Sequence, residues 1–170
     1  MKAFYRYIAA LLLFSIFGFA TCKYSFDEKG TLPPEVKTFR VNYFENRAQY
    51  VNTQLAPQLT EKLRQKIINT TRLRQTNDND AHYDISGWVS EYYASSAGIT
   101  GNNTTTNRLN VSFHVIFKNN LDDTKSFETD IAANSDFNGN KSLNEAESAL
   151  TPDIIKNLTD QIYNKIFSNW

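Results

Sequence analysis

Oxygen-bearing side chains within residues 136–147 have the spacing of a calcium-binding loop. Asp136, Asn138, Asn140, Asn144 and Glu147 stand at its first, third, fifth, ninth and twelfth positions. Calcium favours this spacing because alternate oxygens and a final bidentate glutamate can surround one ion. However, Lys141 stands at the sixth position, where glycine makes the required turn, and the segment before the loop has the pattern of a strand. The pattern therefore favours a polar loop between a strand and a helix, and no metal is expected.

The chain has two histidines, His82 and His114, and both fall in predicted strands. Two imidazoles would need a further ligand to hold zinc, and Asp84 is the candidate. Nothing in the spacing fixes such a geometry, so surface histidines are the favoured interpretation. No nucleophile elbow or phosphate-binding loop is present, and we predict no catalytic residue, no cofactor and no enzyme activity.

Cys22 is the single cysteine of the chain, and it follows a basic start and a short apolar run. Residues 8–19 are uncharged but too few for a transmembrane helix, which needs about 20 residues. This pattern predicts a lipoprotein signal peptide over residues 1–21. The segment ending at Cys22 resembles a bacterial lipobox, which implies that Cys22 becomes the first mature residue and carries acyl chains on its sulfur and amino group.

The alternative for Cys22 is a free thiol in a plain secreted protein. An unpaired cysteine in an exported protein calls for an explanation, and lipidation supplies one. Several acyl chains also hold a membrane far more firmly than a single chain does. Cys22 is therefore predicted to be a membrane anchor.

Composition and the positions of prolines divide the rest of the chain into a tether and one domain. The 170 residues include 18 basic and 18 acidic residues, so no basic excess points to nucleic acid. Residues 22–34 have no hydrophobic period and end in two prolines, which predicts a lipidated N-terminus and short tether. Residues 35–170 are long enough for a single domain, and its hydrophobic core must stabilise it without disulfides.

Alternating apolar and polar residues predict four strands, at residues 35–44, 82–97, 108–118 and 126–133. Three groups of side chains are expected on the core faces of the first three strands: Phe39, Val41 and Tyr43; Tyr83, Ile85 and Val89; and Leu109, Val111, Phe113, Val115 and Phe117. Trp88 and Tyr92 are expected on the opposite face of the second strand. Gly87 would mark a bulge or close packing. The polar stretch 98–107 is predicted to be a long hairpin tip.

Helical periodicity predicts two amphipathic helices. The first covers residues 53–69, with Pro57 in its first turn. The second is predicted to begin at Thr151, with Pro152 as its first helical residue, after a capping-box pattern at residues 142–145. The order of elements predicts an α+β fold: a two-layer sandwich in which an about four-stranded, mostly antiparallel sheet carries both helices on one face.

Several segments together resemble the LptE family of lipopolysaccharide-assembly lipoproteins, in the form found in Bacteroidota. They are the lipobox, the Tyr24-Ser-Phe26 tripeptide, TLPPEVKTFRVNYF (31–44), LAPQLTEKLRQKI (55–67), TRLRQT (71–76), NRLNVSFHVIF (107–117) and the terminal FSNW. The resemblance implies a small LptE-like α+β domain over residues 35–170. It also implies a non-enzymatic plug and assembly partner inside the LptD β-barrel of the outer membrane, where lipopolysaccharide moves to the cell surface.

Contact with lipopolysaccharide phosphates would require basic side chains. Arg108 and Lys118 are the candidates by charge and predicted outward position, and no lipopolysaccharide-binding residue is taken from the family itself. Lys23-Tyr24-Ser25-Phe26 follows Cys22 without an acidic residue, which favours a lipid-anchored protein that faces the periplasm. The alternative function is an accessory lipoprotein of another envelope secretion or assembly machine with the same small fold.

Overall fold

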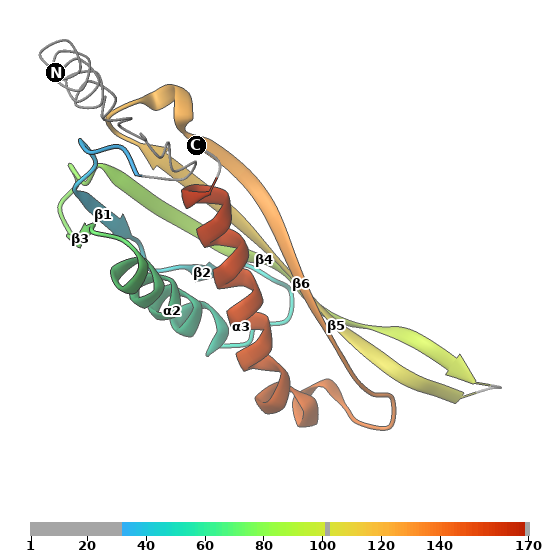
Figure 1. Cartoon of the computed structure of the whole chain (residues 1–170). Helices are drawn as coiled ribbons and strands as arrows, with labels where there is room; N and C mark the ends of the chain where they lie inside the picture. Colours follow the sequence, from blue (N-terminus) through green and yellow to red (C-terminus); the bar gives the residue numbers. More distant parts are fainter. Residues whose placement is uncertain (1–31, 101–102, 169–170) are drawn as a thin grey trace, which may run out of the picture.

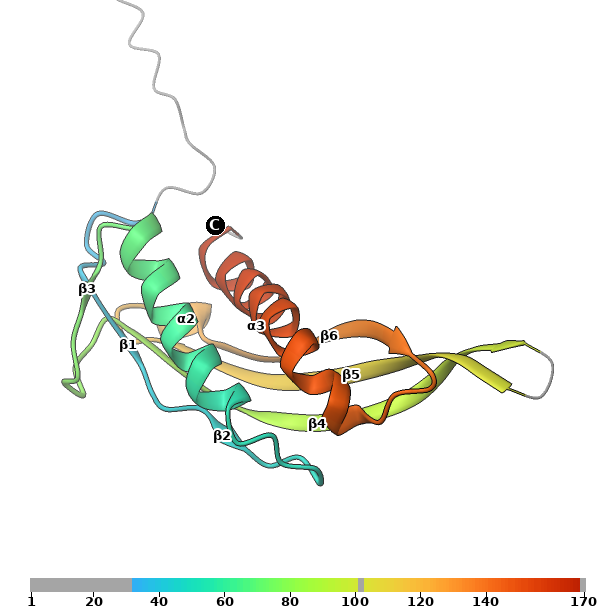
Figure 2. The same cartoon turned by 90° about the horizontal axis from the view of Figure 1, so that it is seen from below.

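The computed structural model describes residues 32–100 and 103–168. Its elements are β1 (Thr38–Val41), β2 (Glu45–Asn46), α2 (Leu55–Thr70), β3 (Arg74–Gln75), β4 (Tyr83–Thr100), β5 (Asn103–Asn119), η1 (Asp123–Lys125), β6 (Phe127–Asn138) and α3 (Leu143–Phe167). The helices α2 and α3 lie side by side along the sheet (Figure 1; Figure 2). The far ends of β4 and β5 project beyond both helices as a ribbon. The α+β class predicted from the sequence is confirmed.

The sheet differs from the predicted one in strand number and direction. It has six strands, in the order β3-β1-β4-β5-β6, with β2 also paired to β4. The long strands β4, β5 and β6 are antiparallel, but β1 pairs in parallel with both β3 and β4, and β2 pairs in parallel with β4. The four-stranded, mostly antiparallel prediction was therefore inexact, because β2 and β3 have two residues each and carry no periodic signal.

Strand β4 contains a register shift that moves Tyr92 to the core face. The pairing with β5 slips between Val89 and Glu91, so two residues of β4 stand opposite one residue of β5. Such a bulge reverses the alternation of the side chains that follow it. Tyr92 is consequently 3% exposed, while Trp88 stays on the outer face as predicted. The prediction that Tyr92 lies on the outer face was wrong for this reason.

Two other details of the predicted strands change. β1 ends at Val41, so the expected inward Tyr43 is 78% exposed and packs against Arg64, with the guanidinium carbon 4.7 Å from the ring centroid. The stretch 98–107 is not one long tip, because β4 continues to Thr100 and β5 begins at Asn103.

The helix α2 begins at Leu55, two residues after its predicted start. The Asn52 side-chain oxygen accepts hydrogen bonds from the backbone N–H groups of Gln54 and Leu55. Pro57 falls in the first turn, where its missing N–H breaks no helical hydrogen bond. The predicted stripe of Leu55, Leu59, Leu63 and Ile67 is fully buried.

The helix α3 begins eight residues before its predicted N-cap. Ser142 and Glu145 form a complete capping box, and the helix continues without interruption to Phe167. Pro152 therefore lies inside the helix, not at its first position. It has no N–H to donate to the carbonyl oxygen of Ser148, one turn earlier. The prediction of a helix start at Thr151 was wrong because the capping box was treated as a separate element.

One hydrophobic core joins both helices to the sheet. It combines the inward side chains of β1, β4 and β5 with the buried stripes of α2 and α3. Gly87 lies where the core is tightest: a Cβ added there would lie 2.2 Å from the His114 carbonyl oxygen and 2.7 Å from the Phe113 ring. Gly87 therefore marks close packing between β4 and β5.

The end of the predicted tether contacts the domain. The Arg72 guanidinium donates to the carbonyl oxygens of Leu32 and Pro33, at 2.7 and 3.0 Å. Val36 follows at once and is buried in the core. In the part of the chain that the structure describes, neither helix has the length and apolarity needed to cross a bilayer.

Candidate functional site on the open face of the sheet

The face of the sheet opposite the helices is mainly polar, and Ile116 is an apolar exception on β5. Even-numbered residues of β5 point to this face, because the odd-numbered residues fill the core. Their side chains bond to neighbouring strands: Ser112 donates to Glu91 at 2.9 Å, and Asn110 donates to Ser95 at 2.9 Å. We call this surface the open sheet face. Its polar groups are matched along the strands, so it is suited to contact with water or another polar surface.

An aromatic and charged cluster lies in the middle of the open sheet face. The Trp88 ring stacks on the His114 ring, with centroids 4.3 Å apart, and the Arg47 guanidinium carbon lies 4.1 Å from the Trp88 ring centroid. His114 Nδ1 lies 2.8 Å from Asp130, and Glu128 lies 3.5 Å from its other ring nitrogen. Trp and Arg are enriched among residues that dominate binding interfaces. This Trp88 cluster is the best candidate contact point of the face.

The register of β4 and β5 explains why Trp88 and His114 meet, since they are paired residues. That contact could have been predicted from the outward positions of both residues. The approach of Arg47 could not, because it follows β2, which has two residues and no sequence signal.

The predicted lipopolysaccharide contacts Arg108 and Lys118 both belong to β5 but lie far apart. Ten residues of extended chain separate them by about 33 Å, so one phosphate cannot reach both. Arg108 also has a partner, since it makes two hydrogen bonds to Asp136, at 2.6 and 2.9 Å. The paired guanidinium lowers the pKa of Asp136, and the carboxylate raises the pKa of Arg108, each mainly through their hydrogen bonds. A phosphate at Arg108 would have to compete with this carboxylate.

The two histidines do not come together. His82 precedes β4 and its Nδ1 accepts a hydrogen bond from the backbone N–H of Lys37 at 3.0 Å. Since Tyr83 pairs with Asn119, His114 lies about 20 Å along the sheet from His82. Among the side chains that the structure describes, no group of three His, Cys, Asp or Glu residues could hold a metal ion.

The calcium-like stretch 136–147 separates into three different structures. Asp136 belongs to β6 and pairs with Arg108. The Asn138 side chain accepts a hydrogen bond from the Asn140 backbone, which forms the turn into α3. Glu147 lies inside α3 and lines a pocket. The oxygens of this stretch therefore do not surround one point.

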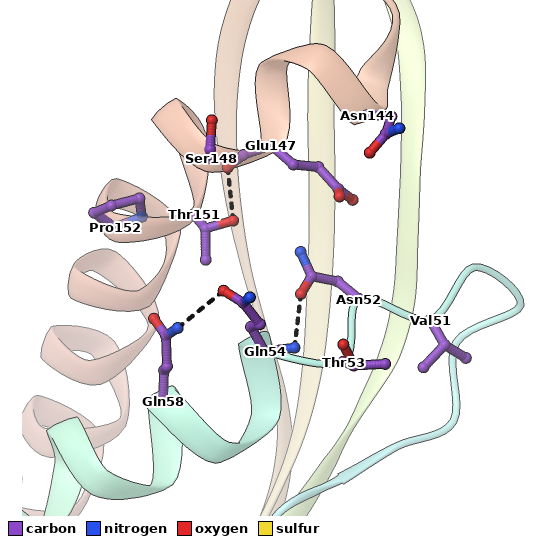
Figure 3. A pocket seen from close by; sticks show the side chains of 10 residues that line it. All are labelled: Val51, Asn52, Thr53, Gln54, Gln58, Asn144, Glu147, Ser148, Thr151 and Pro152. Carbon is purple, nitrogen blue, oxygen red and sulfur yellow. Dashed lines mark hydrogen bonds between the residues drawn. The ribbon is translucent and has the colours of Figure 1, made fainter.

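The pocket at Glu147 opens between the beginnings of α2 and α3 (Figure 3). It has a volume of about 460 Å³, and its lining is mainly amides and hydroxyls, among them Asn52, Gln58 and Asn144. Glu147 reaches from α3 toward the loop that holds Asn52, and its buried Oε1 atom has no hydrogen-bond partner among the residues that the structure describes. With one carboxylate and no basic side chain in its lining, this pocket disfavours anionic ligands.

Two tyrosines stack near this pocket. The rings of Tyr50 and Tyr92 lie 5.5 Å apart. Burial raises the pKa of the Tyr92 hydroxyl, and the nearby Glu147 carboxylate raises it further, while a hydrogen bond from Asn52 opposes this effect. The pKa of Tyr50 is also raised, first by burial and then by Glu147. Both phenols are therefore neutral hydrogen-bonding groups at physiological pH.

Comparison with known proteins decides the family. The sequence model of the LptE family, described as lipopolysaccharide-assembly, matches residues 36–166. The chain belongs to the LptE family. The match runs from the residues before β1 almost to the end of α3, so it covers the sheet and both helices. The resemblance predicted from the sequence is confirmed.

Solved structures with the same fold include two lipoproteins. A minor lipoprotein from Acinetobacter baumannii has a TM-score of 0.54 and 21% identity over 79% of this chain and 94% of that chain. Lipoprotein B from Nitrosomonas europaea has a TM-score of 0.51 and 15% identity over 81% of this chain and 90% of that chain. A hypothetical protein from Chlamydia trachomatis has a TM-score of 0.51 and 8% identity, over 78% of this chain and 99% of that chain. At these identities the likeness extends to the fold alone. No curated protein matches the sequence.

Family membership gives this LptE-family protein a role in lipopolysaccharide assembly. The predicted signal peptide, residues 1–21, and the predicted lipidation site, Cys22, lie outside the residues that the structure describes.

Proposed function

We propose that this protein is the plug and assembly partner of an LptD-type β-barrel in the outer membrane, where it helps to move lipopolysaccharide to the cell surface. The observation that carries the proposal is the match to the lipopolysaccharide-assembly family over residues 36–166. The alternative is an accessory lipoprotein of another envelope secretion or assembly machine.

The open sheet face supports the plug proposal through its chemistry. The interior of an outer-membrane barrel is polar, so a protein seated there should present hydrogen-bonding groups without a large apolar patch. The open sheet face meets this requirement through the bonded pairs Ser112–Glu91 and Asn110–Ser95. The Trp88 cluster adds one aromatic anchor within this polar surface. We therefore place the barrel against the open sheet face.

The N-terminal segment supports a position at the membrane. In this proposal residues 1–21 are removed, Cys22 carries the lipid chains, and residues 22–34 form a short tether. The contact of Arg72 with Leu32 and Pro33 fixes the end of that tether on the domain. A tether of this length keeps the domain next to the outer membrane, on its periplasmic side.

The decisive experiment is affinity purification of the tagged, full-length protein from detergent-solubilised outer membranes, followed by mass spectrometry. We expect an LptD-type barrel in a one-to-one ratio. A different channel in that ratio would favour the accessory-lipoprotein alternative, and the absence of any barrel would overturn the plug proposal.

A crosslinking experiment tests which face meets the barrel. A photoreactive amino acid at Ser112, on the open sheet face, should give a covalent adduct with the barrel. The same amino acid at Asp153, an exposed position on α3, is the matched control and should give none. Adducts from Asp153 alone would place the barrel against the helices and contradict this orientation.

A further inference from the structure

The sheet has one long open edge, formed by β6. Among the described strands, β6 pairs with β5 alone. The opposite edge is β3, which has two residues, whereas β6 has twelve (Figure 1). In an antiparallel strand the backbone N–H and C=O groups of one residue point to the same side, and successive residues alternate. Half of the residues of β6 therefore turn their backbone hydrogen-bonding groups away from β5, toward the edge of the sheet.

A contact with α3 shows which residues these are. The Gln161 side-chain amide donates to the carbonyl oxygen of Ala132 at 2.9 Å, so the backbone of Ala132 faces the edge. The register across the sheet agrees. The carbonyl oxygen of Val89 faces β2, so the preceding even-numbered residues of β4 bond to β5, and His114 turns its backbone away from Asp130. The even-numbered residues of β6 therefore face the edge: Glu128, Asp130, Ala132, Asn134 and Asp136.

A groove lined with side-chain amides opens between this edge and α3. It has a volume of about 330 Å³, and its lining includes the exposed carboxamides of Asn134, Asn157, Gln161 and Asn164. Each carboxamide can both donate and accept hydrogen bonds. A strand added beside β6 would point alternate side chains toward α3 and therefore into this amide groove. Short side chains with a hydroxyl, such as threonine, suit a groove of this size and chemistry.

The other face of β6 carries negative charge. Glu128, Asp130 and Asp136 project on the open sheet face, where their side chains are 64, 73 and 47% exposed and can still be reached by a partner. Arg108 neutralises Asp136. Glu128 and Asp130 share the single imidazole of His114, so negative charge is in excess there. Directly paired residues of neighbouring strands place their side chains on the same face, so basic residues at alternate positions of an added strand would meet these carboxylates.

The same charges disfavour a second copy of this chain at the edge. Antiparallel pairing of two β6 strands centred on Ala132 would place Glu128 of one copy opposite Asp136 of the other. Pairing centred on Ala133 would place Asp130 opposite Asp136. Like charges directly opposite each other destabilise a strand pair. The edge is therefore better matched to a different polypeptide, one with basic residues.

We propose that β6 binds an extended segment of a partner polypeptide as an added strand, with basic side chains on the open sheet face and small polar side chains in the amide groove. Backbone hydrogen bonds to the even-numbered residues of β6 give the affinity, and the alternating side chains give the specificity. The added strand replaces Gln161 as the donor to the Ala132 carbonyl. This inference rests on the edge of β6 and goes beyond the proposed function, because no step of it depends on the barrel.

The test uses the full-length, detergent-solubilised protein and a fluorescent peptide of about nine residues in which lysine and threonine alternate. Binding is measured by fluorescence anisotropy. A peptide of the same composition, with its lysines and threonines in separate blocks, should bind at least about fivefold more weakly, because its basic side chains cannot all lie on one face. Equal binding of the alternating and block peptides would indicate unspecific attraction and overturn the added strand. Absence of binding by the alternating peptide would do the same.

Methylated peptides test the backbone bonds directly. An added strand bonds to β6 through one alternating set of its backbone nitrogens, while the other set faces solvent. Methylation of one set, either that of the lysines or that of the threonines, should therefore abolish binding, and methylation of the other set should preserve it. Equal effects of the two methylations would contradict strand addition.

Variants of the protein test the edge and its charge separately. Asn134→Pro removes one outward N–H but no bond to β5, and edge strands accept proline at such positions. It should weaken binding of the alternating peptide about tenfold or more, whereas Asn134→Ala keeps the N–H and should bind nearly as the wild type does. Glu128→Gln/Asp130→Asn should weaken binding about fivefold. The control Glu61→Gln/Asp153→Asn removes the same charge from exposed helical positions and should change nothing. Unchanged binding in Asn134→Pro, or equal losses in the two double variants, would overturn the proposal.

Amide hydrogen exchange gives a readout that charge attraction alone cannot produce. The odd-numbered N–H groups of β6 bond to β5 and should exchange slowly, whereas the even-numbered ones face the edge and should exchange fast. The alternating peptide should slow exchange at Asp130, Ala132 and Asn134 and leave the odd-numbered residues unchanged. Slow exchange at these three residues in the protein alone, increasing with protein concentration, would indicate a second copy at the edge and overturn the proposed partner.

Discussion

Replacing Gly87 with alanine tests whether β4 and β5 pack as closely as the structure shows. The added Cβ would lie 2.2 Å from the His114 carbonyl oxygen and 2.7 Å from the Phe113 ring. Contacts below 3.0 Å do not occur at real Cβ atoms, so one strand must shift. The carbonyl oxygen belongs to the backbone of β5, and it cannot move without disturbing the ladder to β4 and β6. Side-chain rotation therefore cannot relieve this contact.

The expected loss of unfolding free energy is about 3 kcal/mol, the upper end of the usual cost of overpacking. Proteins of this size have a total stability of about 5–15 kcal/mol, so the variant should still fold. A loss of about 3 kcal/mol corresponds to a fall in Tm of roughly 10 °C. With an m-value of about 2 kcal/mol/M, the urea midpoint should fall by about 1.5 M.

Urea unfolding followed by tryptophan fluorescence measures this effect. The matched control is Ser86→Ala, the neighbouring residue on the open sheet face, which should change stability by less than about 0.5 kcal/mol. Phe113→Leu lowers stability by itself because Phe113 is fully buried, so Gly87→Ala is compared in both backgrounds. It should cost less in the Phe113→Leu background but still destabilise, because only the ring contact is relieved. A loss below about 1 kcal/mol for Gly87→Ala, or no loss from Gly87→Ala in the Phe113→Leu background, would refute the backbone contact.

Three further predictions concern the helices and one ion pair. Pro152→Ala restores a donor to the Ser148 carbonyl and should raise unfolding free energy by up to about 3 kcal/mol, measured by urea unfolding; a lower stability would mean that α3 depends on the proline. Asn52→Ala removes the side-chain oxygen that accepts from the Gln54 and Leu55 N–H groups at the start of α2, so it should cost about 1–2 kcal/mol, and an unchanged thermal midpoint would contradict that role. Because Arg108 lowers the pKa of Asp136, the folded state binds fewer protons there, so this stabilisation is present above about pH 4 and lost as pH falls further. Asp136→Asn should therefore reduce the loss of unfolding free energy in acid, measured by urea unfolding between pH 3 and pH 7. If unfolding free energy depends on pH equally in the variant and the wild type, the pair contributes nothing.

Periodicity predicted the elements that bury a continuous face. The alternation from Leu109 to Phe117 and the stripe from Leu55 to Ile67 both describe the observed core, because each pattern spans several turns or residue pairs. These long patterns are enough to fix the α+β class and the pairing of the helices with one sheet. These periodic patterns can be recognised without knowing which distant parts of the chain are in contact.

Periodicity did not predict the short strands or the local irregularities of the longer elements. β2 and β3 have two residues each, so no period can show them, and their parallel pairing depends on where α2 returns the chain. The bulge after Val89 reversed the predicted side of Tyr92, since alternation cannot reveal an inserted residue. Pro152 favoured a helix start where α3 has already made two turns. In each case tertiary packing overrides a valid local preference.

The predicted lipopolysaccharide contacts Arg108 and Lys118 also show what periodicity cannot predict. Outward alternation placed Arg108 and Lys118 on β5, but their separation and the Asp136 partner depend on the register with β6. The ion pair between Lys66 and Asp160 likewise depends on the register between the two helices. On one helix Lys62 precedes Lys66 by four residues, and on the other Lys156 precedes Asp160 by four, so the sequence allows more than one alignment.

A slip of one turn would exchange the roles of these residues. Lys62 would then face Asp160 and be neutralised, while Lys66 would face Asn164, and no two free lysines would meet. The observed contact of Lys66 with Asp160 excludes that alignment and leaves Lys62 opposite Lys156. Which lysine pairs with Asp160 is therefore decided by the packing of α2 on α3.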